Sequence, residues 1–159
     1  MALELTWGVM KIAIKEIILV ALTGCFPALL IQYNEGVGKL KDFVSGAIVP
    51  NYIFYYFLSF FVLHLLLTTL CWLYGYRFSP EKQKEAKQKI IYIGEVGDST
   101  LGIYRLASGL LFAIPIVWKF TEPNTITNLE FVGLTSYALL FLVGVTVISN
   151  INLWAKSKL

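Results

Sequence analysis

Charged residues are scarce in this chain, and their scarcity argues against a water-soluble domain. Of its 159 residues, 14% are Asp, Glu, Lys or Arg, whereas 57% are hydrophobic. A soluble domain usually carries about 25% charged residues, because its surface has to be solvated. A chain with so few charges is expected to be covered by lipid instead. We therefore predict an integral membrane protein whose first partner is the lipid bilayer.

Histidine and cysteine are also rare, which restricts the available chemistry. The chain has 1 His and 2 Cys, too few for a histidine-rich metal site or a disulfide framework. Cys25 and Cys71 fall in different halves of two apolar runs, so their depths should differ by more than about 10 Å. A disulfide needs Cα atoms within about 7 Å. Both thiols are predicted to be free, and no metal or cofactor is expected.

The sequence motifs of familiar enzymes are missing as well. It contains no phosphate-binding loop, glycine-rich dinucleotide turn, HExxH or CxxC motif. The net charge of +3 does not indicate nucleic-acid binding, because the cations flank apolar runs rather than forming a separate basic patch. No catalytic residue is assigned, and an enzyme is disfavoured. Polar groups from several membrane helices can still form a site without a local motif.

What the chain does contain is four apolar runs of membrane length. A helix needs about 20 residues to cross the hydrocarbon core of a bilayer. We predict an all-α fold, a four-helix transmembrane bundle that forms a single membrane domain over residues 1–159. Aromatic residues at both ends of the second run are typical of a helix that joins the two membrane interfaces. The predicted spans cover residues 17–33, 51–74, 100–118 and 129–154.

The segment before the first span has two faces. Between Leu3 and Ile17, apolar residues form one stripe, and Glu4, Lys11 and Lys15 lie on the opposite one. This pattern predicts an amphipathic helix that lies at the lipid headgroups. The alternative is the same helix standing upright, with its lysines reaching back to the interface.

Two interruptions are predicted near the end of the first span. Pro27 should kink or loosen the helix, because proline lacks the amide donor of a helical hydrogen bond. Residues 34–38 read as a turn, and residues 39–48 form an amphipathic piece too short to cross the bilayer. That piece is predicted to rest on the far membrane surface.

Lysine and arginine are distributed unevenly between the two sides of the predicted bundle. Four spans place both termini and the connector 77–99 on one side. Of the 13 Lys and Arg residues, Lys39, Lys41 and Lys119 fall on the opposite side, which leaves 13 − 3 = 10 on the first. The positive-inside rule makes the first side cytoplasmic. We predict both termini inside, in the cytoplasmic (inner) membrane of a bacterium.

The connector is the most basic stretch of the chain. Its first part carries five cations against the two anions Glu81 and Glu85. Asp98 or Ser99 is a suitable N-cap for the third span. We predict that the connector is the cytoplasmic contact for a partner, through Arg77, Lys82, Lys84, Lys87 and Lys89.

Three polar residues inside the spans form the candidate intramembrane site, His64, Thr68 and Arg105. Ionisable groups within a membrane are candidates for function by default. The structural interpretation is that a neutral His64 imidazole bonds to Thr68 or a neighbouring helix. For Arg105 it is that the side chain snorkels or pairs with Asp98. Polar groups concentrate in the inner halves of the spans, which does not indicate a permanently open aqueous pore.

These features predict a non-enzymatic multi-pass membrane protein. It would act by oligomerisation or by binding a membrane or cytoplasmic partner, as an accessory, immunity or sensor-type subunit. One alternative is a gated pore or a membrane-permeabilising protein, of the holin or defence-effector kind. A second alternative is a small transporter or membrane enzyme that uses His64 and Arg105.

Overall fold

The structure is a computed structural model that describes residues 2–47, 51–77, 79–124 and 126–157. The described residues are all-α, in agreement with the predicted fold class. Four helical stretches are long and apolar enough to cross a membrane, which confirms the predicted number. They cover Val9–Gly36, Tyr55–Gly75, Ser99–Thr121 and Asn128–Lys156.

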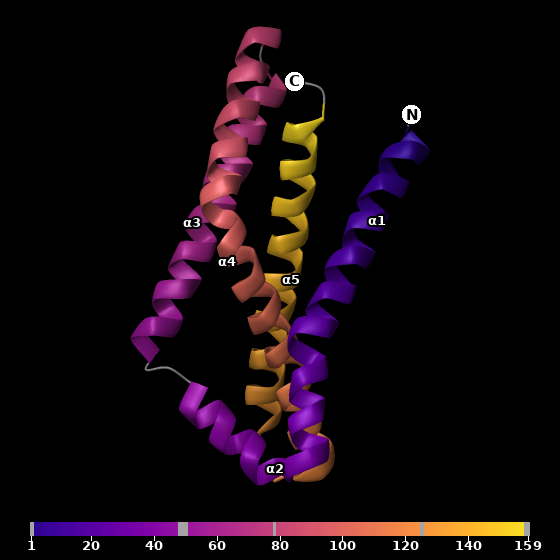
Figure 1. The fold of residues 1–159 in the computed structure, drawn as a ribbon, viewed down its shortest axis with the longest axis vertical. Helices are drawn as coiled ribbons and strands as arrows, with labels where there is room; N and C mark the ends of the chain where they lie inside the picture. Colours follow the sequence, from indigo (N-terminus) through magenta and orange to yellow (C-terminus); the bar gives the residue numbers. More distant parts are fainter. Residues whose placement is uncertain (1, 48–50, 78, 125, 158–159) are drawn as a thin grey trace.

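The first of these stretches begins earlier than predicted, because helix α1 (Ala2–Val20) crosses the expected boundary at Ile17 without a break. It continues through a π-helical turn, η1 (Ala21–Cys25), into α2 (Phe26–Ala47). Figure 1 shows α1 in line with the start of α2 and alongside α5. This arrangement corresponds to the upright alternative for the amphipathic segment.

The π-helical turn has a local cause in Pro27. Proline has no amide donor, and its ring clashes with the carbonyl four residues earlier, here that of Thr23. The preceding amide of Phe26 bonds to the carbonyl of Ala21, five residues back, which is the π-helical pattern. The loosening predicted at Pro27 is therefore confirmed.

A second interruption lies at Gly36, within α2. Its φ of 80° and ψ of 178° are non-helical. Glycine adopts a positive φ at little cost because it has no Cβ atom. The turn predicted at residues 34–38 is confirmed here, and the remainder of α2 turns aside toward α3 (Figure 1).

Helices α3 (Asn51–Arg77) and α4 (Pro80–Thr121) form a long antiparallel hairpin (Figure 1). The predicted start of the third helix at Asp98 or Ser99 is wrong, since α4 is continuous over 42 residues. Pro80 occupies the first turn, where proline is well tolerated, and the Lys, Glu, Gln and Ala residues that follow favour a helix. The basic connector is thus largely helical, although the apolar part of α4 begins at Ser99 as expected.

The last helix, α5 (Asn128–Lys156), matches the predicted span 129–154 closely. Its start is fixed by a capping box, in which Thr127 Oγ1 accepts the Glu130 amide at 3.2 Å. The Glu130 carboxylate in turn accepts the Thr127 amide at 2.9 Å. Two backbone amides at the helix start are satisfied in this way.

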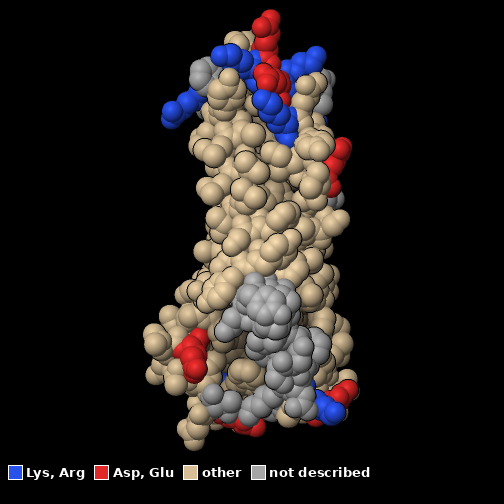
Figure 2. Space-filling view, turned by 90° about the vertical axis from the view of Figure 1, so that its left-hand side faces the viewer, with Lys and Arg blue, Asp and Glu red and all other residues tan. Residues whose placement is uncertain are grey.

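The start of α1, the end of α5 and the turn between α3 and α4 all lie at one end of the molecule (Figure 1). Figure 2 shows charged side chains gathered near the two ends, with a broad band of uncharged surface between them. Such a band is what lipid covers in a membrane protein.

Small residues allow close helix contacts inside the bundle. A Cβ atom on Gly24 would lie 2.5 Å from the Cα of Gly109, so η1 and α4 touch through their backbones. A Cβ on Gly75 would lie 2.5 Å from that of Ala86, which joins α3 to α4. Close approach through small residues is a main source of helix association in lipid. These small residues are therefore used within the chain.

Candidate functional site

Arg105 and Glu16 form a buried ion pair between α4 and α1. The arginine donates from Nε to Glu16 Oε2 at 2.7 Å and from Nη2 to Oε1 at 2.9 Å. Ser149 on α5 donates its hydroxyl to Glu16 Oε1 at 2.8 Å. The Glu16 side chain is 0% exposed and that of Arg105 is 18% exposed. One carboxylate therefore connects three helices.

The geometry of this cluster decides what it can do. A two-pronged arginine–carboxylate contact is among the stronger hydrogen-bonded pairs, and it holds both groups in a fixed orientation. Arg105 supplies the counter-charge that the fully buried Glu16 carboxylate needs. The cluster is thus suited to fixing the relative positions of the helices. Because the two charges are paired with each other, neither is available to bind a transported ion.

Arg105 differs from its sequence-based interpretation. Snorkelling or pairing with Asp98 was expected, whereas the guanidinium reaches Glu16 on another helix. The Asp98 side chain lies outside the described residues. The available signal was that Glu16 and Arg105 carry opposite charges in the same half of their spans. Choosing Glu16 as the partner required the relative placement of α1 and α4.

His64 and Thr68 lie on the face of α3 that packs against α4. His64 is 4% exposed, Thr68 is 0% exposed, and the His64 ring touches α4 where a Cβ on Gly97 would overlap it. Both imidazole nitrogens of His64 and the hydroxyl of Thr68 lack a hydrogen-bond partner among the described residues. The expected bond between His64 and Thr68 is not formed.

The three residues of the predicted intramembrane site do not converge. His64 packs at Gly97, which precedes Arg105 by eight positions on α4 and so lies roughly 12 Å away along that helix. Arg105 turns instead to α1 and α5. The structure thus joins His64 and Thr68 on one face and assigns Arg105 to a separate cluster.

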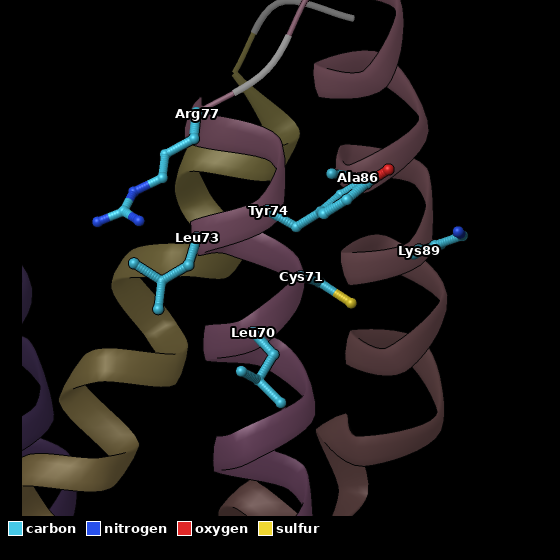
Figure 3. Close-up of a pocket in the computed structure, with 7 residues that line it drawn as sticks. All are labelled: Leu70, Cys71, Leu73, Tyr74, Arg77, Ala86 and Lys89. Carbon is cyan, nitrogen blue, oxygen red and sulfur yellow. The ribbon is translucent and has the colours of Figure 1, made fainter.

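The cysteines behave as predicted. Both thiols are free. Cys25 donates its thiol to the carbonyl of Gly109 at 3.4 Å, beside the closest approach of η1 and α4. Cys71 lies on α3, in the gap toward α4 (Figure 3).

The predicted basic contact surface lies at the turn end of the α3–α4 hairpin, and several of its cations have partners. Lys89 donates to Glu85 at 2.6 Å, one helical turn earlier. The hydrogen bond from Lys89 holds the pKa of the Glu85 carboxyl below its ordinary value, and the same bond raises the pKa of Lys89. Both side chains are more than half exposed, so solvent screens the pair strongly.

Two further lysines of this surface fasten the hairpin. Lys87 donates to the Ser157 carbonyl at 2.6 Å and lies 5.2 Å from the Trp154 ring, which ties α4 to the end of α5. Lys82 lies 6.0 Å from the ring of Tyr74 on α3. Cations over aromatic faces contribute about 0.5–1 kcal/mol at exposed sites. The basic surface is therefore held in a defined shape.

A cavity of about 640 Å³ lies beside this surface, between α3 and α4 (Figure 3). Cationic side chains from both helices border it, and the rest of its lining is mainly apolar. Sequence reasoning missed the cavity, because its lining comes from two helices whose relative placement is set only by the tertiary structure. It is lined by Leu70, Cys71, Leu73, Tyr74, Arg77, Ala86 and Lys89.

Comparison with known proteins provides no analogue. No family model, no curated protein and no solved structure matches the chain. Its function is therefore inferred from the geometry and charges of its own residues.

Proposed function

We propose that this chain is a non-enzymatic multi-pass membrane protein that acts by binding a partner at the α3–α4 hairpin. The observation that carries this proposal is the contrast between the intramembrane charges and the hairpin cations. Glu16 and Arg105 bond to each other inside the bundle. Lys84 and Arg77, in contrast, are exposed at the end of the hairpin. The recognition chemistry lies at the hairpin.

The proposed topology places this hairpin in the cytoplasm. The start of α1, the end of α5 and the α3–α4 turn share one end of the molecule (Figure 1). The helix ends gathered there carry Arg77, Lys82, Lys84, Lys87, Lys89 and Lys156. The positive-inside rule supports a cytoplasmic location for this end. The proposed location is the cytoplasmic membrane of a bacterium, with both termini inside.

A transporter or pore is less well supported. A transport site needs an ionisable group that can exchange its partner, whereas the Glu16 carboxylate already accepts three hydrogen bonds, from Arg105 and Ser149. An aqueous pathway also needs polar lining along its length. Backbone contact between Gly24 and Gly109 leaves no space between η1 and α4.

The proposed partner is an acidic protein surface in the cytoplasm. Basic residues on a rigid hairpin raise the association rate with an acidic surface and help to fix its orientation. Self-association through Gly24, Gly75 and Gly109 is less favoured, because these three glycines are engaged within the chain. Binding to an acidic surface would weaken as salt rises, since the charges are exposed.

Two measurements test this proposal. The first expresses the chain in bacteria while a dye reports the membrane potential; we expect no depolarisation at any expression level. Depolarisation that disappears in Arg105→Ala would instead support a pore, and the binding proposal would be withdrawn.

The second measurement places a photo-crosslinking amino acid at Lys84 and, as a control, at Val143, which is exposed on α5. We expect a discrete protein adduct from position 84 alone, which decreases in a Lys82→Gln, Lys87→Gln background. Equal labelling from both positions, or an adduct unaffected by the lysine substitutions, would contradict a hairpin contact.

A further inference from the structure

A continuous furrow follows the contact between α3 and α4. The cavity of about 640 Å³ described above shares Cys71 and Lys89 with a second cavity of about 370 Å³. The second cavity shares Tyr92 and Ile93 with a third, of about 240 Å³. Three cavities that share their linings in this way form one path between the helices.

The polarity of the furrow changes along its length. At the hairpin end the furrow is bordered by Arg77 and Lys89. Arg77 lies two residues beyond Gly75, where the apolar stretch of α3 ends. At the other end the lining includes Phe60, Leu63 and Val96, all within the bundle. A cationic end at the membrane boundary followed by an apolar path matches the polarity of an anionic phospholipid.

The length of the furrow also matches a lipid. From Arg77 to Phe60 there are 17 positions on α3, which is roughly 25 Å at 1.5 Å per residue. One leaflet, with its headgroups, is about 20–22 Å thick, or half of the full bilayer. A single phospholipid aligned with α3 would therefore reach from one end of the furrow to the other.

We propose that this furrow binds one anionic phospholipid from the bilayer. Its phosphate lies near Arg77, and an acyl chain follows Tyr92 and Ile93 toward Phe60. This goes beyond the proposed partner contact: the two sites share Arg77 at the end of α3, but Lys84 of the hairpin lies outside the furrow. The bound lipid would fill the space between α3 and α4 and stabilise the angle of the hairpin.

Arg77 is the principal anion ligand of this site. Figure 3 shows Arg77 on α3 and Lys89 on α4, with their side chains directed to opposite sides in this view, and both residues line the first cavity. Lys89 forms an ion pair with Glu85, so it contributes less net positive charge to the site than Arg77 does. The guanidinium of Arg77 can also hold two phosphate oxygens at once, which a lysine ammonium cannot do with the same geometry.

The test measures lipid retention by the purified full-length protein in detergent. Equal amounts of phosphatidylglycerol and phosphatidylcholine are added, and native mass spectrometry counts the bound molecules. We expect wild type to retain phosphatidylglycerol preferentially. Arg77→Gln should lower that preference about fivefold, the effect of one cation at a membrane surface. Lys84→Gln is the matched control, because it removes one charge from the same hairpin outside the furrow lining.

A second variant tests the apolar path. Ile93→Trp fills the point where the second and third cavities meet, and we expect it to reduce retention of both lipids. Leu66→Trp adds the same bulk at a residue that is 52% exposed on α3 and lines none of the three cavities, so it should behave as wild type.

The outcomes that overturn the proposal are distinct. If wild type retained the two lipids equally, the site would not select an anionic headgroup. If Ile93→Trp retained lipid as wild type does, the furrow would not be the binding site. An equal effect of Arg77→Gln and Lys84→Gln would show non-specific charge attraction. Because no protein partner is present, these results do not depend on the proposed hairpin contact.

Discussion

The bundle has two kinds of helix interface, and they use polar residues differently. Where α1, α4 and α5 meet, Glu16 is fully buried and each of its oxygens accepts a hydrogen bond. Where α3 meets α4, His64 and Thr68 are equally enclosed but lack partners among the described residues. The first interface is closed by charge pairing and backbone contact, whereas the second contains a furrow.

This difference follows from the position of α3 in the bundle. The most apolar window of α4 has 44% of its residues buried, compared with 17% for α3. A peripheral helix offers one narrow face to its neighbours and leaves the rest to lipid. We infer that buried charge pairing stabilises the α1–α4–α5 interface, whereas the α3–α4 interface combines apolar packing around Phe61 with an open furrow along its surface.

The strongest test of this contrast is Arg105→Met. The substitution leaves the Glu16 carboxylate buried without its counter-charge, which typically costs about 3–5 kcal/mol. We expect a loss of this size in the free energy of unfolding, measured by denaturant titration in detergent micelles with circular dichroism. The double variant with Glu16→Gln should recover most of it, because no unpaired charge remains. A loss below about 1 kcal/mol in the single variant would mean that the ion pair does not hold the helices.

Gly109→Ala tests the backbone contact in the same interface. Its Cβ atom would lie 2.5 Å from the Val20 carbonyl oxygen at the end of α1 and 2.6 Å from the Gly24 Cα in η1, so this segment and α4 must separate. Overpacking of this kind costs about 1–3 kcal/mol. Gly102→Ala is the matched control on the same helix, because its Cβ would meet nothing within 4 Å. It should leave stability unchanged or raise it by up to about 1 kcal/mol. Similar losses in both variants would refute the close contact.

His64→Leu tests the second interface. Removal of a buried imidazole that has no partner should change the free energy of unfolding by less than about 1 kcal/mol, or increase it. The measurement is the same denaturant titration, with Phe61→Ala as a control for loss of a fully buried apolar side chain. A loss above about 2 kcal/mol would show that His64 has a stabilising partner.

The smallest effect is expected at the exposed pair Glu85–Lys89. The pKa of Glu85 is lowered and that of Lys89 is raised, so the pair stabilises the start of α4 fully at pH values between the ordinary, unfolded-state pKa values of the two groups. Its contribution is lost as pH falls through the folded-state pKa of Glu85, and again as pH rises through that of Lys89. Amide hydrogen exchange in the hairpin at about pH 7 and about pH 3 should detect the acid loss. In Glu85→Gln, the part of the change in amide exchange between the two pH values that comes from the pair should disappear. If the full change persists in this variant, groups other than Glu85 and Lys89 cause it.

Several features could be read from the sequence because their causes are local. The four apolar stretches follow from side-chain hydropathy and the length needed to cross a bilayer. The π-helical turn before Pro27 and the bend at Gly36 follow from the backbone limits of proline and glycine. The continuity of α4 also had a local signal, in the helix-forming residues after Pro80, although the charge of the connector obscured it.

Tertiary structure alone decided which residues meet. The Glu16–Arg105 contact joins residues 89 positions apart, and the Ser149–Glu16 contact joins residues 133 apart. An apolar helix can pack at many rotations and axial shifts with similar burial, since lipid solvates its surface almost as well as another helix does. Hydropathy therefore determined how many helical stretches are long and apolar enough to cross a membrane. Close packing of small residues and pairing of buried charges determined the partner of Arg105 and the path of the furrow.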